Sequence, residues 1–445
     1  MDLASLIPTF GSFAFTIIAF VVALSIIVAI HEYGHYIVGR WTGIKADVFS
    51  VGFGPVLVSR KDRHGTSWQI AALPFGGFVK FRGDGNAASA KDDDAMEGLT
   101  PEERRATMHG APLWARTLTV LAGPVFNFIL SFLVFAALLM VRGVASDPIS
   151  IDALRPVPSD VQELASGDVI LAVNGTLVPP TEEFQELRGS LEPTERTTYT
   201  VLRAGQELDI EGPWIFPALA GSVTPGSAAE EAGLKDGDVI TAVDGDPIFD
   251  FEQLREKVRA SDGDAIALSV WRDGQSEIFT MTPRRTDLPL ADGSFETHYI
   301  IGVSPAMVFT PASETPGLVE ALGYGVDQIV FITKSSISGL YHMIAGKIST
   351  CNMSGPIGIA ETSGQAASQG WLSFIWFIAV LSTAVGILNL FPIPVLDGGH
   401  LVFYFWEAVT GHPPSDQALR YLMAGGLTIM LGLMVFAVTN DLFCP

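Results

Sequence analysis

A charge-free apolar run that leads directly into a metal-ligand motif constrains this chain more than any other feature. Residues 13–30 carry no charged side chain, and a run of that length is typical of a transmembrane helix. The motif HEYGH follows at residues 31–35. Residues four apart share one face of a helix, so His31 and His35 can bind one divalent metal while Glu32 acts as a base. The combination predicts hydrolysis of a peptide bond within or beside a lipid bilayer.

A simpler interpretation of the same residues needs no metal. The His and Glu side chains would lie at the membrane interface and extend to water, and HExxH alone also occurs by chance. Ionisable side chains at membrane depth are costly, however, and such a residue indicates a functional site by default. We therefore favour the metal site.

The composition indicates apolar membrane helices and acidic soluble parts within one chain of 445 residues. Hydrophobic residues make up 48% of the sequence, yet the formal net charge is −22. This acidity argues against a nucleic-acid partner, because binding phosphates requires basic surfaces. The two cysteines, Cys351 and Cys444, are too few for a disulfide framework. The sequence leaves open whether they are free thiols or one bridge on an oxidising face.

Four apolar stretches predict four transmembrane helices. We place them within residues 1–39, 114–143, 370–400 and 418–440. No basic segment precedes the first, which therefore reads as a retained helix and not as a cleaved signal peptide. The segment 40–113 is rich in Lys and Arg, and the positive-inside rule places it in the cytoplasm. Both chain ends and the region between the second and third helices are then outside the cytoplasm, with the metal motif near the cytoplasmic side.

The predicted external region contains an internal repeat. SGDVILAVNG at residues 166–175 matches DGDVITAVDG at 236–245, and the FQELR and VLRAGQ segments after the first copy match FEQLR and VWRDGQ after the second. Both copies predict the order strand, turn, helix, strand. We therefore expect two tandem modules of one small fold, at 144–215 and 216–286.

Two further segments separate these modules from the third transmembrane helix. Residues 287–316 are rich in Pro, Asp and Thr and are expected to be a linker. Residues 317–360 show an amphipathic helical pattern that contains Lys334. This pattern favours helices at the membrane interface over an additional span.

A second motif offers the third metal ligand that the first motif lacks. Catalytic zinc usually has three protein ligands and one open position. Asn389, Pro392 and Pro394 precede Asp397 in the segment NLFPIPVLDGGH. The prolines prevent a regular helix and free the backbone to line a cavity, and the two glycines after Asp397 permit close approach. We therefore predict that the Asp397 carboxylate meets the two imidazoles of the first motif.

These motifs in this order, with the repeat between them, resemble the site-2 protease family of intramembrane zinc metalloproteases, in its bacterial form with tandem circularly permuted PDZ domains. The resemblance covers nearly the whole chain and includes the pattern GPxxN at residues 123–127. It implies a polytopic α-helical protein of the bacterial inner membrane, with four transmembrane helices, a membrane-associated β-structure and two periplasmic α+β PDZ domains. It also implies Zn2+ as the cofactor, with His31, His35 and Asp397 as ligands and Glu32 as the catalytic base.

The resemblance assigns roles to further residues. Asn389, with Pro392 and Pro394, would contact the substrate backbone near the scissile bond. The β-structure would pair with an unwound substrate strand through Gly76, Gly77, Phe78, Val79 and Lys80. A plain cytosolic hairpin is the alternative for that segment. The Gly-rich turn at Gly221, Ser222 and Val223 would be the peptide-binding loop of the second PDZ module, although both modules could instead act only by excluding bulky substrates.

The predicted function is regulated intramembrane proteolysis of single-span membrane proteins that have already been cut elsewhere. An anti-sigma factor and remnant signal peptides are the substrate classes that the resemblance implies. The alternative is a non-catalytic membrane scaffold that presents the PDZ modules and tolerates loss of Glu32. A transporter is less favoured, because the spans carry few other paired ionisable groups and no inverted repeat. Among the other histidines, His400 is expected to support the site without binding metal, and His109 to lie on the surface.

Overall fold

The computed structural model describes residues 6–85, 98–290 and 295–444. The chain falls into two compact units, residues 1–138 with 318–445 and residues 139–317. The predicted segments 1–39, 40–113 and 287–316 lie partly outside the described residues.

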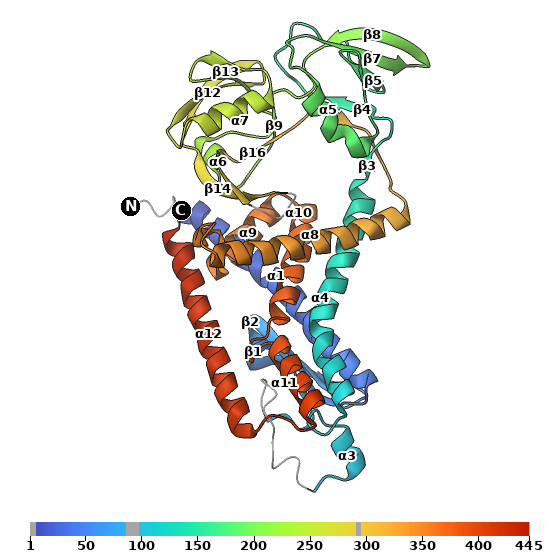
Figure 1. The fold of residues 1–445 in the computed structure, drawn as a ribbon, viewed down its shortest axis with the longest axis vertical. Coiled ribbons are helices and arrows are strands. Elements are labelled where there is room, and N and C mark those ends of the chain that lie inside the picture. The colour runs from blue at the N-terminus through green and yellow to red at the C-terminus, as the bar shows by residue number, and fades with distance from the viewer. Residues whose placement is uncertain (1–5, 86–97, 291–294, 445) are drawn as a thin grey trace. The chain divides into compact units, whose positions relative to one another are not determined.

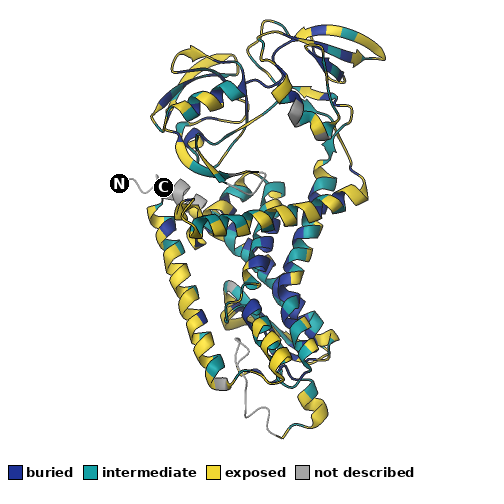
Figure 2. Ribbon diagram, viewed as in Figure 1, coloured by how far each residue is buried: buried dark blue, intermediate teal, exposed yellow. Residues whose placement is uncertain are grey.

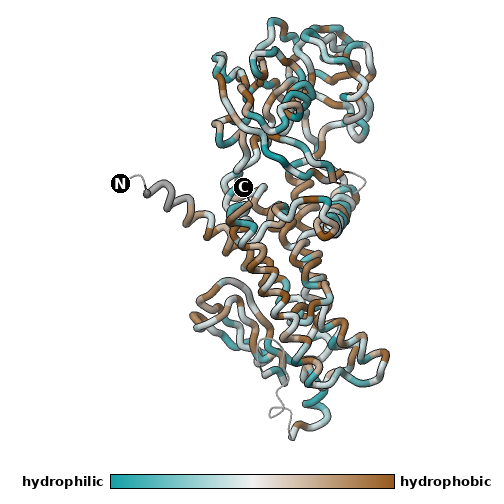
Figure 3. Tube along the Cα trace, turned by 60° about the vertical axis from the view of Figure 1, so that its left-hand side comes forward, coloured by the Kyte–Doolittle hydropathy of each residue, from teal (hydrophilic) through white to brown (hydrophobic). Residues whose placement is uncertain are grey.

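Four helices in the described part of the chain are long and apolar enough to cross a membrane, as predicted. They are α1 (Leu6–Trp41), α4 (Leu113–Arg142), α10 (Trp371–Asn389) and α12 (Asp416–Phe443), labelled in Figure 1. Figure 3 shows their apolar character in brown. Large apolar side chains such as Leu133 and Leu431 are exposed on them. Such a surface suits lipid, because a helix satisfies its own backbone hydrogen bonds.

A bent antiparallel hairpin follows α1. It consists of β1 (Ala46–Lys61) and β2 (Ser67–Phe81). Val48 pairs with both Ser67 and Lys80, because each strand bends back on itself near glycines with positive φ, Gly52 and Gly76. The first half of β1 therefore lies between the two halves of β2, which makes residues 77–81 an edge strand. The short helix α3 (Pro101–Arg105) follows the hairpin.

The remaining helices of this unit are shorter or amphipathic. They are α8 (Leu318–Ile344), η3 (Thr350–Asn352), α9 (Pro356–Ser368) and α11 (Asp397–Thr410). Helix α8 leaves apolar side chains such as Phe331 and Ile344 exposed. The helical structure expected over residues 317–360 is present, with a break between α8 and α9.

The C-terminal end of α12 is fastened to the segment before α9. Cys444 forms a disulfide with Cys351, so the two cysteines are bridged and not free thiols. Asp441 accepts backbone N–H bonds from Gly355 at 2.7 Å and from Ile357 at 2.9 Å, where α9 begins. Along most of its remaining length α12 is exposed, as Figure 2 shows in yellow. The helix is therefore held mainly at this end.

The second unit confirms the internal repeat strand by strand. One four-stranded sheet has the order β6-β5-β7-β8 and the other the order β11-β10-β12-β13. Each has a register shift at the same place, between Ile170 and Ala172 in β5 and between Ile240 and Ala242 in β10. The strands and helices are β5 (Val169–Val173), β6 (Thr176–Leu177), η2 (Thr181–Glu183), α5 (Phe184–Ser190), β7 (Thr197–Arg203) and β8 (Gln206–Gly212), and then β10 (Val239–Val243), β11 (Asp246–Pro247), α7 (Phe251–Ala260), β12 (Ile266–Arg272) and β13 (Gln275–Met281).

A buried ion pair is also repeated. Asp168 bonds Arg203 at 2.6 Å and 2.7 Å, and Asp238 bonds Arg272 at 2.6 Å through both carboxylate oxygens. Both aspartates are buried and both pairs have the two-pronged geometry that gives strong, specific ion pairs. The matching positions show that the two copies share their packing as well as their strand order.

The two modules are nested, which the sequence did not lead us to expect. Short strands complete them: β3 (Val144–Ala145), β4 (Ile151–Leu154), β9 (Ala220–Val223), helix α6 (Ala228–Ala232), β14 (Arg284–Pro289), β15 (Phe295–Ile300), β16 (Val303–Pro305), β17 (Phe309–Pro311) and β18 (Ser313–Glu314). Strand β17 pairs with β4, and Phe309 lies in the core of the first copy beside Ile151 and Tyr199.

The first copy is therefore built from residues 144–217 and 306–314, which we call the outer module. The second copy, residues 218–305, is inserted within it and is called the inner module; β16 pairs with β9 there. Residues 287–316 were expected to be a linker, and this is wrong for the part that the structure describes. Their short strands pair with distant partners, a pattern too brief to show in the composition.

Candidate metal centre

Two helices bring the predicted ligand atoms together in the membrane-helix unit. His31 and His35 lie one turn apart on α1, and Asp397 is the first residue of α11. Asp397 Oδ2 is 3.1 Å from Nε2 of His31 and 3.5 Å from Nε2 of His35. The two Nε2 atoms are 3.1 Å apart. Both imidazoles are buried, and the three atoms all lie within 4.8 Å of one another.

Residues of helix α4 contact the Nδ1 atom of each imidazole, whose Nε2 atom faces Asp397. Nδ1 of His35 donates to the carbonyl oxygen of Thr119 at 2.9 Å, which leaves Nε2 with a lone pair for a metal. The amide nitrogen of Asn127 lies 3.2 Å from Nδ1 of His31. Asn127 Oδ1 is buried with no hydrogen-bond partner among the described residues. Exchanging the two amide atoms, which resemble each other closely, lets Oδ1 accept from Nδ1–H of His31 and gives that ring the same metal-binding tautomer.

Glycines make room for this centre. A Cβ atom at Gly123 of α4 would lie 2.3 Å from His35 Nε2 and 2.8 Å from His31 Cε1. At the start of α11, a Cβ atom at Gly398 would lie 2.3 Å from the carbonyl oxygen of Phe391, and one at Gly399 would lie 2.3 Å from that of Ile393. The predicted close approach after Asp397 is therefore present.

The residues at this centre fit a zinc ion. Asp397 Oδ2 is buried and faces both imidazoles, but no donor hydrogen-bonds to it among the described residues. Two imidazole nitrogens and one carboxylate oxygen are the donor set of many catalytic zinc sites, which keep a fourth position open. His31, His35 and Asp397 would hold the ion.

The proposed base lies between the ligands and the hairpin. Glu32 follows His31 on α1, and the backbone of Val79 in β2 hydrogen-bonds its carboxylate. A Cβ atom at Gly77 would lie 3.3 Å from the Cγ atom of Glu32. The edge strand, which contains Gly77, Phe78, Val79 and Lys80, therefore passes directly alongside Glu32, and Gly76 lies at the bend before it.

The other residues predicted to bind substrate lie a few positions before Asp397 in the sequence. Their contacts alone do not identify a substrate site. Asn389 ends α10 and its side-chain nitrogen donates to the carbonyl oxygen of Val385 at 3.0 Å. Pro392 and Pro394 lie in the irregular segment that leads to Asp397. A Cβ atom at Gly426 of α12 would lie 3.0 Å from Pro394 Cδ, so α12 contacts this segment.

Two of the sequence expectations need correction. Gly221, Ser222 and Val223 lie in strand β9 and not in a turn. Their strand pairs with β16, so they do not form a free loop of N–H donors. His109 is half-buried and not a plain surface residue, because its Nε2 atom lies 3.2 Å from the buried carboxylate of Asp84.

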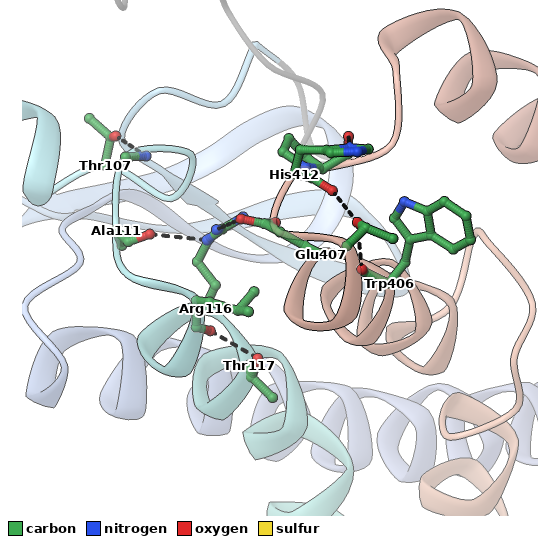
Figure 4. Close-up of polar contacts among 11 residues, drawn as sticks. Thr107, Ala111, Arg116, Thr117, Trp406, Glu407 and His412 are labelled. Carbon is green, nitrogen blue, oxygen red and sulfur yellow. Dashed lines mark hydrogen bonds and ion pairs between the residues drawn. The ribbon is translucent and has the colours of Figure 1, made fainter.

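The residues that support the ligands had not been predicted from the sequence. Thr119 lies one helical turn before Gly123 of the GPxxN pattern, and that spacing is the signal that could have revealed it. Arg116 and Glu407 form an ion pair between α4 and α11, shown in Figure 4. The two residues are 291 positions apart, and no local pattern links them.

The chain matches known proteins over nearly its whole length. The family model described as peptidase family M50 matches residues 19–433. A putative zinc metalloprotease of Agrobacterium fabrum is 34% identical over 430 residues, which are 96% of this chain and 95% of the relative. One from Rhizobium meliloti is 36% identical over 430 residues and 96% of each chain. The regulator of sigma-E protease of Salmonella typhimurium is 32% identical over 468 residues, covering 97% of this chain and 99% of the relative.

Proposed function

Since the chain belongs to peptidase family M50 and is a zinc metalloprotease, we propose that it cuts single-span membrane proteins within the bilayer by regulated intramembrane proteolysis. One observation carries this proposal. The three ligand atoms of His31, His35 and Asp397 converge beside Glu32, in a unit that contains membrane-length helices.

The chemistry follows from the positions of these residues. Zn2+, when bound, polarises the scissile carbonyl and allows a water to lose its proton near neutral pH. Glu32 takes that proton and returns it to the leaving amine. The carboxylate of Asp397 and the two imidazoles would hold the ion, and the contacts of Thr119 and Asn127 keep the rings in place.

We propose that the edge strand of the hairpin holds the substrate. A helix in lipid has all its backbone groups bonded, so a substrate must unwind before it can be cut. Residues 77–81 form an edge strand, and such an edge can pair with an extended peptide. A segment paired with residues 77–81 would lie beside Glu32. Asn389 would contact the substrate backbone after turning away from Val385.

We further propose a position in the bacterial inner membrane, with the centre near the cytoplasmic side and the nested modules, read as PDZ domains, in the periplasm. The basic segment around the hairpin supports the cytoplasmic assignment. The Cys351–Cys444 disulfide supports an oxidising compartment at the other end of α12.

The substrate classes that we propose are an anti-sigma factor and remnant signal peptides. One relative is named regulator of sigma-E protease, which favours the anti-sigma factor. The nested modules would admit substrates whose external domain has already been removed. A single-span substrate with and without a folded external domain tests this filter, and equal cutting rates would refute it.

The main experiment compares wild type with Glu32→Gln in lipid, using a model single-span substrate and measuring bound zinc. We expect wild type to cut within the span, and the variant to retain zinc without cutting. Glu361→Gln, an exposed site on α9, is the matched control and should cut normally. Zinc-free wild type would refute the metal centre. A variant that binds zinc and cuts as wild type does would refute the role of Glu32 and favour a different base.

A further inference from the structure

An ion pair outside the metal centre joins the start of α4 to the last turns of α11 (Figure 4). The two Nη atoms of Arg116 bond the two carboxylate oxygens of Glu407 at 2.6 Å and 3.1 Å. Nε of the same guanidinium donates to the carbonyl oxygen of Ala111 at 3.0 Å. The guanidinium also lies over the ring of Tyr404, 5.2 Å from its centroid. This pair has no part in the chemistry proposed above.

The pair is held more firmly than an ordinary surface ion pair. The side chains of Arg116 and Glu407 are only 14% and 17% exposed. Two parallel bonds between a guanidinium and a carboxylate fix direction as well as distance. Exposed pairs contribute little because the side chains move and water screens them, and neither condition holds here.

The face of α4 that carries Arg116 also carries the supports of the metal ligands. Thr119, Gly123 and Asn127 follow Arg116 at steps of three and four residues, so all four share one side of the helix. Thr119 and Asn127 contact the two imidazoles. The same face of α4 therefore contacts both histidines through Thr119 and Asn127, and contacts Glu407 through Arg116 at the start of the helix.

The face of α11 that carries Glu407 also carries Asp397. Leu401 and Tyr404 lie between them at steps of four, three and three residues, and both pack against the core around the base of the hairpin. Ten residues of helix separate the metal ligand from the ion pair by roughly 15 Å. Helix α11 therefore carries Asp397 in its first turn and Glu407 in its last.

After Tyr404, every residue of α11 except Glu407 is exposed. Only Gly398 and Gly399 of α11 are fully buried, and both lie beside Asp397. On the opposite side of the helix Phe405 is 71% exposed and Val409 is 70% exposed. Without the ion pair, the last turn of α11 would lose its contact with α4, and the packing of Leu401 and Tyr404 would be left to hold the helix beyond its first turn.

We propose that Arg116 and Glu407 are positioning residues for the metal ligand Asp397. The pair sets the direction of α11 against α4, and Asp397 Oδ2 thereby meets both imidazoles. This inference rests on the proposed metal function, because it assigns the pair a role in holding zinc.

The test measures zinc affinity and stability separately. Zinc affinity is determined by competition with a chelator, on the full chain in detergent, and thermal unfolding is measured on the zinc-free protein. For Glu407→Gln we expect about tenfold weaker zinc binding, the lower end of the effect of groups that support metal ligands. The exchange Arg116→Glu with Glu407→Arg restores the pair in reverse and should recover most of that loss. In an Asp397→Ala background, Glu407→Gln should have no further effect on residual zinc binding.

A matched control separates positioning from stability alone. Arg203→Gln breaks the equivalent two-pronged pair with Asp168 in the outer module, and should lower the unfolding temperature while leaving zinc affinity unchanged. Arg116→Lys keeps the charge but loses the fork, and carries the test if Glu407→Gln fails to fold; it should weaken zinc binding by a smaller factor. Wild-type zinc affinity in a folded Glu407→Gln or Arg116→Lys protein would overturn the inference while the proposed function stands. Wild type that binds no zinc would overturn both.

Discussion

Gly123 lies directly against the imidazole of His35: a Cβ atom on this glycine would be 2.3 Å from Nε2, the nitrogen that faces Asp397. Helix α4 therefore passes the metal centre so closely that only hydrogen fits between its backbone and the ligands. The contact also explains why this position of the helix is glycine, because small residues let the backbone of one membrane helix approach another closely.

Gly123→Ala should abolish zinc binding while the protein remains folded. Alanine is a better helix former than glycine by about 1 kcal/mol, so the helix itself is not weakened, but the new methyl group displaces His35. Bound zinc measured beside the circular dichroism spectrum checks this. Gly323→Ala on α8, where a Cβ atom meets nothing within 4 Å, is the matched control and should keep its zinc. Full zinc occupancy in Gly123→Ala would show that the two helices separate easily.

Asn127→Leu should weaken zinc binding by about 10- to 100-fold, as expected for loss of a group that orients a ligand histidine. Leucine is similar in size but cannot accept from Nδ1–H of His31. Asn127→Asp keeps an acceptor and should bind zinc at least as tightly as wild type. Chelator competition on both variants measures the effect. If both variants bind zinc equally well, the orientation of His31 does not depend on Asn127.

Removing the Cys351–Cys444 disulfide should lower the unfolding temperature. The bridge joins residues 93 positions apart, and closing a loop of that size contributes at most about 4 to 5 kcal/mol through the unfolded chain. Cys351→Ser and Cys444→Ser should lower it by the same amount, because either one opens the bridge. A maleimide should label wild type only after reduction. Labelling of the untreated mature protein would contradict the bridge.

Asp62, at the turn of the hairpin, should make hairpin stability depend on acidity. Burial raises the pKa of this carboxyl, but bonds from the Trp68 indole, the backbone N–H groups of His64 and Thr66, and the Tyr36 hydroxyl outweigh it and lower the pKa from 3.8 to about 2. A lowered pKa in the folded state stabilises the fold above the unfolded value, and this contribution is lost as the pH falls from 3.8 to about 2.

Hydrogen exchange of the hairpin amides in wild type and Asp62→Asn checks that dependence. At pH 7 the variant should exchange faster, because it loses the charged acceptor. The difference should shrink as the pH falls through the same interval. A difference that stays constant down to the lowest pH would show that charge is not the cause.

The motif-bearing parts of this molecule could be predicted because their signals are local. The apolar runs gave the four long helices, and HEYGH placed His31 and His35 on one helical face. The prolines before Asp397 indicated an irregular approach, and Gly398 and Gly399 show the contacts expected of them. In each case the property depends on neighbours a few residues away.

The missed features all depend on distant partners. Strand β17 is three residues long and joins a sheet edge begun more than 150 residues earlier, with no alternation to reveal it. Gly221 to Val223 resembled a turn because glycine often marks one, but pairing with β16 draws them into a strand. Arg116 carried only the signal of its charge, since its partner lies on a helix at the far end of the chain.

The nesting of the modules sets the order in which they can be completed during synthesis. A chain made from its N-terminus completes residues 218–305 before Phe309 and β17 exist, so the inner module has every strand of its own when the outer one still lacks part of its core. The outer module is therefore completed last, after the module inserted within its sequence has all its strands. A stalled or truncated chain that ends near residue 305 would contain a finished inner module and an open outer one.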